Sequence, residues 1–264
     1  MRLFWKAVVR LYPFSRGRIR LIGFARKRVG GIVLHKDGQG NLLLLDLDNL
    51  IDTTIYLQGS YELEAMQALA KHAEQRACTH FIDVGANLGV YSLYFARIAA
   101  IKEIWAFEPD PHNYAQFMAN LWLNQLAERV HVSDAALSTQ DGTTTFYTFN
   151  RRRLPGGWNF NTGTSSLLKA GSKNHTPITV QTRRLDNVLS LNGQNILMKI
   201  DVEGAERMVL DGAHQLLKNN RCVVMLEVWS HPPDGLEKMT QYMSQLGYGR
   251  VAADLGPDNY LFAN

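Results

Sequence analysis

The sequence predicts an α/β fold built around a mostly parallel sheet. Short apolar runs that are typical of buried strands alternate with stretches of helical periodicity, which is the pattern of successive βαβ units. A glycine-containing turn joins the first central strand, residues 81–82, to a helix expected over residues 88–99. At 264 residues, the chain is long enough to bury one large core.

The turn after the first central strand is the organising motif, with the run DVGANLG at residues 83–89. Gly85 permits a positive φ and, lacking a side chain, would let a ligand approach the backbone, while Gly89 would let the helix pack closely on the strand. The helix N-terminus also offers free N–H groups and partial positive charge. A second strand, residues 104–107, ends at Glu108, whose carboxylate suits the hydroxyls of a ribose. This unit is therefore predicted to bind an adenosine-type ligand.

Asp83, at the end of the first central strand, helps to decide which adenosine-type ligand is bound. A dinucleotide site would show the pattern GxGxxG around a pyrophosphate, which Asp83 would repel. A carboxylate there suits a cation or an ammonium group. S-adenosylmethionine (SAM) carries an α-ammonium group, a sulfonium and a ribose with both hydroxyls, so we favour SAM over a dinucleotide or a unit without a ligand. Asp134 and Ala135, after a third strand at residues 130–132, are expected beside the adenine, with Asp134 accepting from its amino group.

A second focus is the run KIDVEGAE at residues 199–206, after a fourth strand at 196–200. Asp201 or Glu203, placed beside a transferred methyl group, could take a proton from an attacking hydroxyl. These carboxylates could alternatively help to hold a divalent metal. Lys199 could lower the pKa values of its neighbours or pair with one of them. Glu203 also lies in the first turn of the next helix, where negative charge is favoured in any case.

Strand ends elsewhere carry further candidates. Glu227 lies near the end of a fifth strand, residues 222–228, and His231 follows that strand directly and is a candidate base. In open α/β sheets ligands bind outside the carboxyl ends of the strands, so these side chains are expected to share one face. Polar and aromatic residues for a sugar acceptor are Trp158, Asn159, Asn161, Thr164, Ser165 and Trp229.

The remaining elements are assigned from periodicity and turn chemistry. Residues 31–47 predict a hairpin, residues 55–57 a short strand, and a helix is expected from residues 59–62 to Arg76 with Ser60 as its cap. The later assignments are helices over 110–126, 185–189 and 236–246, a helix that ends near 218, strands at 143–149 and 178–182, a loop over 150–176, and an antiparallel pair at 248–252 and 259–262.

Charge is distributed unevenly along the chain. Residues 1–36 carry ten Lys or Arg and no acidic residue, and the remainder carries 18 basic against 24 acidic residues. The acidic remainder argues against a broad nucleic-acid surface. The N-terminal segment could form a helix that packs on the domain or on a second subunit, or it could lie on an anionic membrane surface. Base-stacking aromatic residues are sparse there, so nucleic acid is the weakest interpretation.

Composition indicates a globular protein in a reducing compartment. Cys78 and Cys222 are interpreted as buried reduced thiols, and no apolar run is long enough for a transmembrane helix. The N-terminus lacks the pattern of a secretory signal. We therefore expect a cytoplasmic location, with contact at the inner membrane surface as an alternative for the basic segment.

Several of these motifs together resemble the FkbM family of SAM-dependent methyltransferases. They are the runs at 83–89 and 199–206, Glu108-Pro109, Gly59-Ser60-Tyr61-Glu62, Asn161-x-Gly-x-Ser-Ser-Leu and Leu226-Glu227. The resemblance implies a Rossmann-like seven-stranded sheet of order 3-2-1-4-5-7-6, with strand 7 antiparallel and helices on both faces. It implies that Asp83, Gly85, Asn87 and Glu108 bind SAM, and that Asp201, Glu203 and Glu206 face the reacting centre. Gly89, Tyr61 and Glu62 are added to the cofactor set as members of these motifs.

The resemblance also implies O-methylation of a hydroxyl, often on a sugar of a glycan, glycolipid or secondary metabolite. We expect residues 1–50 to form a basic helix and hairpin extension, and residues 51–264 to form the methyltransferase domain. The alternative from another class is a non-catalytic SAM-binding or scaffold protein of a glycan-biosynthesis complex. A nicotinamide dehydrogenase is disfavoured by Asp83 and by the missing glycine pattern.

Overall fold

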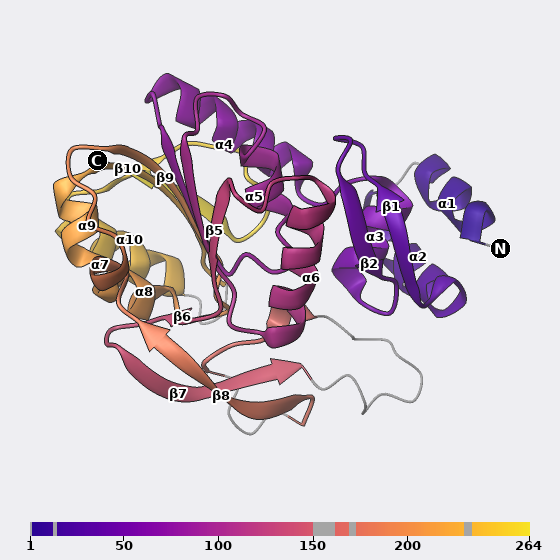
Figure 1. The fold of residues 1–264 in the computed structure, drawn as a ribbon. Coiled ribbons are helices and arrows are strands. Elements are labelled where there is room, and N and C mark those ends of the chain that lie inside the picture. The colour runs from indigo at the N-terminus through magenta and orange to yellow at the C-terminus, as the bar shows by residue number, and fades with distance from the viewer. Residues whose placement is uncertain (1, 13–14, 150–161, 169–172, 230–233) are drawn as a thin grey trace.

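The structure is a computed structural model that describes residues 2–12, 15–149, 162–168, 173–229 and 234–264 (Figure 1). Its centre is a seven-stranded sheet of order β5-β4-β3-β9-β10-β12-β11. The strands are β5 (Val130–Ser133), β4 (Glu103–Phe107), β3 (His80–Val84), β9 (Asn195–Ile200), β10 (Arg221–Glu227), β12 (Asn259–Ala263) and β11 (Gly249–Val251). Only β12 runs antiparallel to its neighbours β10 and β11 among these strands. The predicted order, with its antiparallel seventh strand, is confirmed.

Helices cover both faces of this sheet (Figure 1). One face carries α4 (Leu63–Gln75), α5 (Val90–Phe95) and α6 (Pro111–Leu123), and the other carries α7 (Leu185–Val188), α8 (Glu206–Gly212), α9 (His214–Asn219) and α10 (Gly235–Gln245). Side chains alternate along β3, so that Phe81 packs into the core with Phe95 and Phe117. Ile82 and Val84 enter the opposite core. Burial on both faces explains why the central strands are continuously apolar.

Four local predictions are corrected. Residues 55–57 belong to helix α3 (Leu50–Gln58), where Ile51 and Ile55 are buried one turn apart, so the strand predicted from the short apolar run is wrong. Helix α4 begins later than expected, with Glu62 rather than Ser60 at the N-cap position. Helix α5 spans residues 90–95 instead of 88–99, because the chain is still turning at Gly89 with φ 91°. The helix expected to reach 218 is divided into α8 and α9 at Ala213.

A smaller sheet lies beside the main one. Strand β7 (Gly142–Phe149) pairs antiparallel with β8 (His175–Arg183), which also pairs with β6 (Ala136–Leu137). The two predicted strands at 143–149 and 178–182 are thus partners. The intervening stretch includes a short 3-10 turn at residues 162–164, while residues 150–161 and 169–172 lie outside the described part of the chain.

The N-terminal segment forms helices α1 (Arg2–Leu11) and α2 (Ser15–Val29) and the predicted hairpin of β1 (Ile32–Lys36) and β2 (Leu42–Asp46). Amide side chains of α6 and its C-cap bond the free edge of β2: Asn120 Oδ1 accepts from Leu44 N at 2.7 Å, and Asn124 Nδ2 donates to Leu42 O at 2.7 Å. Leu43 and Leu45 join the core around Phe117. The hairpin is therefore packed on the main sheet's helices, and a domain boundary at residue 50 stays a prediction.

Two other expectations concern burial and membranes. Cys78 and Cys222 are both buried and unbridged, as the sequence predicted. Among the helices in the described ranges, none combines the length and apolar character needed to cross a bilayer.

Close packing at Gly89 generates a stability prediction. A Cβ atom there would overlap the ring of Phe117, and the φ of 91° is unfavourable for an L side chain. Gly89→Ala should lower the free energy of unfolding by about 2–4 kcal/mol, measured by urea titration. The matched control is Gly193→Ala, because Gly193 also has positive φ (68°) but a Cβ atom added there would meet no atom of the described residues within 4 Å. It should lose only about 1 kcal/mol; equal losses would show that backbone strain, not the Phe117 contact, sets the cost.

Candidate active site

The turn after β3 is shaped by contacts between strand ends. Gly85 has φ 77°, and a Cβ atom there would overlap the carbonyl oxygen of Asp201 at the end of β9. The amides of Gly85 and Ala86 both donate to the carbonyl of Phe107, at 3.0 and 3.1 Å, which ties the turn to β4. The missing side chain therefore lets β3 and β9 approach each other, whereas the sequence had suggested that it makes room for a ligand.

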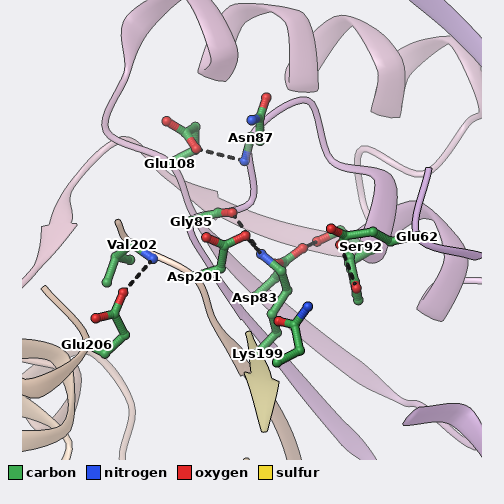
Figure 2. A network of polar contacts seen from close by, with 12 residues as sticks. Glu62, Asp83, Gly85, Asn87, Ser92, Glu108, Lys199, Asp201, Val202 and Glu206 are labelled. Atoms are coloured by element: carbon green, nitrogen blue, oxygen red, sulfur yellow. Dashed lines mark hydrogen bonds and ion pairs between the residues drawn. The ribbon is translucent and has the colours of Figure 1, made fainter. Parts of the chain in front are cut away.

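Glu108 lies at the end of β4 and is held by two backbone amides (Figure 2). Asn87 N donates to Oε2 at 2.7 Å and Asp110 N donates to Oε1 at 2.9 Å. Burial, followed by the nearby charge of Asp110, raises the pKa of Glu108 to about 8. The side chain of Asn87 lies beside it, and its buried Oδ1 accepts no hydrogen bond from any described residue. Both side chains are thus placed to receive donors from a ligand.

The ammonium group of Lys199 lies at the junction of β3 and β9 (Figure 2). Its Nζ is 3.0 Å from Asp201 Oδ2 and 3.9 Å from Asp83 Oδ1, and it donates to the carbonyl of Gly85 at 3.2 Å. Burial alone would lower the pKa of Lys199, but the charges of Asp201, Asp83 and Glu62 outweigh it and the net pKa is raised. Lys199 is therefore a fixed cation and not a general base.

Three carboxyl groups gather where β9 and β10 end. Asp201, Glu203 and Glu227 each bring an oxygen within 4.8 Å of the others. Burial, and then the charge of Asp201 and a hydrogen bond with it, raise the pKa of Glu227 to about 9. At neutral pH Glu227 thus holds a proton, with which it can hydrogen-bond to Asp201. The group has the ligand types for a divalent cation, although Lys199 already neutralises one of its members.

One cavity joins the two acidic regions. Its lining includes the glycine turn and Glu108 on one side and the carboxyl cluster on the other. Among the lining residues are Tyr61, Glu62, Gly85, Asn87, Tyr91, Glu108, Asn113, Ala135, Ser165, Leu167, Lys199, Asp201, Glu203 and Glu227. A ligand bound at Glu108 would therefore share one cavity with a reactant at Asp201.

The segment at residues 162–168 forms a wall of this cavity. Ser165 Oγ donates to Asp110 Oδ2 at 3.0 Å, and Ser166 Oγ donates to the carbonyl of Glu203 at 2.9 Å. Asp110 is also the N-cap of α6, accepting from His112 N and Asn113 N. The wall is thus tied at one end to the Glu108 region and at the other to the carboxyl cluster.

Several predicted cofactor residues lie on the cavity and others do not. Gly85, Asn87, Glu108, Ala135, Tyr61 and Glu62 line it. Asp83 is fully buried beneath the cavity, where Ser92 Oγ donates to its Oδ2 at 2.7 Å. The cation near Asp83 is Lys199, and not the ligand that the sequence suggested. Gly89 packs on Phe117 of α6 and is not a lining residue. Asp134 is exposed and also absent from the lining, so its predicted adenine contact receives no geometric support.

Some of the predicted catalytic and acceptor residues line the cavity and others do not. Asp201 and Glu203 line the cavity, as does Ser165, whereas Thr164 and Trp229 are not among its lining residues. Glu206, expected to face the reacting centre, instead accepts from Gly204 N at 2.9 Å and Val202 N at 3.4 Å, because it closes the first turn of α8. His231, Trp158, Asn159 and Asn161 lie outside the described residues.

Sequence reasoning placed Glu227 on the ligand face without a role and did not consider Tyr91, and both line the cavity. Tyr91 Oη donates to Glu62 Oε2 at 2.9 Å, and its ring lies 5.1 Å from Lys199 Nζ. Glu227 was expected on this face by the rule that selected Asp201, since it also ends a parallel strand. Tyr91 is harder to predict from the sequence, where it stands out only by its position just beyond the glycine motif. Its partner Glu62 is the N-cap of α4, so the contact depends on where α4 begins.

A sheet of this order, with a cavity over the carboxyl ends of its strands and an acidic residue ending β4, defines the SAM-dependent methyltransferases as a class. Glu108 and the Asn87 side chain fit SAM, whose ribose and amino groups supply hydrogen-bond donors. A family model of the methyltransferase FkbM domain matches residues 83–249, and the chain belongs to this family.

Individual relatives agree with this assignment. Methyltransferase sdnD of Sordaria araneosa is 29% identical over 209 residues, which cover 68% of this chain and 78% of that protein. The 2-O-methyltransferase NoeI of Sinorhizobium fredii is 29% identical over 154 residues, covering 54% of this chain and 60% of NoeI. A crystal structure of an FkbM methyltransferase from Methylobacillus flagellatus KT matches with a TM-score of 0.51 at 13% identity, over all of this chain and 59% of the other, and supports the fold alone.

Removing the buried cation should destabilise the fold in a pH-dependent way. Lys199→Met leaves Asp83 and Asp201 without their cation, and the pKa of Asp83, which burial already raises, should rise further. The free energy of unfolding should fall by about 3–5 kcal/mol at pH 8. The loss should be smaller near pH 5, because a carboxyl group whose pKa is raised in the folded state destabilises that state only as it ionises.

Urea titrations at both pH values measure this, and Lys71→Met is the control because Lys71 is an exposed lysine of α4. That variant should change the free energy of unfolding by less than about 0.5 kcal/mol. A loss for Lys199→Met that is the same at pH 5 and pH 8 would assign Lys199 to packing instead of charge neutralisation.

Glu108 should make cofactor binding depend on pH. Because burial raises its pKa to about 8, the carboxylate that accepts from ribose hydroxyls is fully formed only above that pH. The affinity for S-adenosylhomocysteine, measured by calorimetry, should therefore rise as the pH rises through about 8. Glu108→Gln should bind about 10–100-fold more weakly and lack this rise. Glu103→Gln, at the other end of β4, should bind like wild type; if Glu108→Gln does so too, the ribose assignment is wrong.

Proposed function

We propose that the protein is a SAM-dependent O-methyltransferase whose acceptor is a hydroxyl group of a sugar in a glycan, glycolipid or secondary metabolite. The observation that carries this proposal is the single cavity lined by both Glu108 and the carboxyl cluster of Asp201, Glu203 and Glu227. Oxygen as the acceptor atom is supported by the similarity to the 2-O-methyltransferase NoeI. The cofactor site consists of the lining residues Tyr61, Glu62, Gly85, Asn87, Glu108 and Ala135.

SAM supplies a methyl group on a sulfonium that is already activated for displacement. The protein's main contribution is then alignment of the acceptor oxygen with that methyl group, which can lower the barrier by roughly 7–11 kcal/mol. The hydrogen bonds from Ser165 to Asp110 and from Ser166 to Glu203 support such alignment, since they fix the cavity wall that borders both reactants.

The acceptor hydroxyl must lose its proton as the new C–O bond forms. Asp201 and Glu203 are the candidates to receive it, because both are carboxylates on the cavity wall. Glu227 is the weaker candidate, since its raised pKa of about 9 leaves it protonated at neutral pH. Lys199, 3.0 Å from Asp201, holds that carboxylate in place. Glu227 can in turn donate a hydrogen bond to Asp201 and fix its orientation.

Substitution of the two candidate bases tests the reaction. Asp201→Ala and Glu203→Ala should each be assayed for methyl transfer from labelled SAM to a glycan extract, and at least one should lower turnover by about 10²–10⁴-fold. Binding of S-adenosylhomocysteine should persist in that variant. Glu128→Gln, an exposed carboxyl group beyond α6, is the control for a lost negative charge. Full turnover in both alanine variants would rule out these residues as the base.

The same assay on the wild-type protein distinguishes an enzyme from a non-catalytic scaffold. Methyl transfer to a component of the extract supports the enzyme, and the mass and linkage of the product would identify the hydroxyl. Binding of SAM without transfer to any sugar-containing fraction would instead support a non-catalytic SAM-binding or scaffold protein.

A further inference from the structure

Helix α1 presents apolar residues on two opposite sides. Val9 is fully buried and Trp5 packs beside it against Ile22 of α2 and Leu57 of α3. Leu3, Phe4 and Leu11 lie on the other side of the helix and are 80%, 62% and 81% exposed. Packing of α1 on the domain, which the sequence offered as one alternative, therefore accounts for only half of its apolar residues.

Neighbouring elements extend the apolar surface at this end of the molecule. Ile32 and Leu34 are 70% and 58% exposed on the outer side of β1, and Phe24 of α2 is 41% exposed. Helices α1 and α2 and the hairpin occupy the end of the molecule opposite α9 and α10 (Figure 1). Exposed side chains of this size are unusual in such number on one segment of a globular protein.

Positive charge accompanies these apolar residues. Residues 1–36 contain ten Lys or Arg and no Asp or Glu, while the rest of the chain has 24 acidic and 18 basic residues. Arg20, Arg28 and Lys36 are among the exposed basic residues, and the guanidinium carbon of Arg28 lies 3.8 Å from the ring centroid of Phe24. A cationic, apolar end on an acidic body complements a negatively charged surface that has an apolar interior.

We propose that the exposed face of α1, together with the basic residues of the first 36 positions, binds the surface of an anionic phospholipid bilayer. Leu3, Phe4 and Leu11 would enter the boundary between headgroups and acyl chains, and the basic side chains would contact the lipid phosphates. A second copy of this chain is a poorer occupant, because pairing the segments would bring two sets of ten like charges together. Nucleic acid would match the charge but leave the aliphatic side chains exposed.

Vesicle sedimentation tests the assignment with the full chain. Vesicles of phosphatidylcholine mixed with phosphatidylglycerol should sediment the wild-type protein, and vesicles of phosphatidylcholine alone should not. The triple variant Leu3→Ser, Phe4→Ser, Leu11→Ser should lose at least about ten-fold in partition coefficient. Raising the salt concentration should also reduce binding, because the Debye length shortens.

A matched control separates this face from apolar exposure in general. Met118→Ser with Trp122→Ser removes two exposed side chains of α6, 36% and 74% accessible, that lie outside the basic segment. That variant should bind vesicles like wild type. Both variants should bind S-adenosylhomocysteine normally, which confirms that they are folded and keeps this test independent of the methyl-transfer assay.

Three outcomes would overturn the assignment. Wild-type protein that does not sediment with vesicles containing phosphatidylglycerol has no affinity for an anionic bilayer. A triple variant that still sediments with the vesicles shows that the face of α1 is not the contact. Light scattering that finds a wild-type dimer and a monomeric triple variant, without vesicle binding, would assign the face to a second copy.

Discussion

The buried ammonium of Lys199 joins the parts of the site. It contacts Asp201, which follows its own strand β9, and it reaches Asp83 and the Gly85 carbonyl on β3 and the turn after it. Removing an ammonium group from water costs several kcal/mol unless partners replace the solvent, and here two carboxylates and a carbonyl do so. For Asp83, Lys199 in turn opposes the rise in pKa that burial causes. The structure of the cavity floor therefore requires Lys199, both carboxylates and the Gly85 carbonyl together.

The parallel arrangement of the strands explains why binding and chemistry share one cavity. Because β3, β4, β9 and β10 all end on the same edge of the sheet, Glu108 and the Asp201 cluster face a common space although they are far apart in sequence. The two regions have different electrostatics. Burial and the charge of Asp110 raise the pKa of Glu108, whereas Asp201 forms an ion pair with Lys199. One region suits hydroxyl donors of a ribose, and the other suits a reacting hydroxyl.

The N-terminal elements differ physically from the body of the protein. Their inner faces continue its core through Leu43 and Leu45, so they are not a loose appendage. Their outer faces combine positive charge with exposed Leu3 and Phe4, which the rest of the fold does not need for stability. The carboxyl edge of the sheet thus carries the candidate site, and the outer faces of the N-terminal elements form the surface that we propose contacts a bilayer.

The sequence alone determined the glycine turn and the acids at the strand ends, because strand period and turn chemistry are local properties. The order of the strands was implied only by the resemblance of the motifs to a known family. The sequence could not decide which acids reach the cavity. Asp83 turned inward to Lys199 and Glu206 closed a helix turn, while Glu227 joined Asp201, since these outcomes depend on how separate strands approach. The strand predicted at 55–57 failed for the same reason: the packing of α3 on the hairpin outweighed the β propensity of its residues.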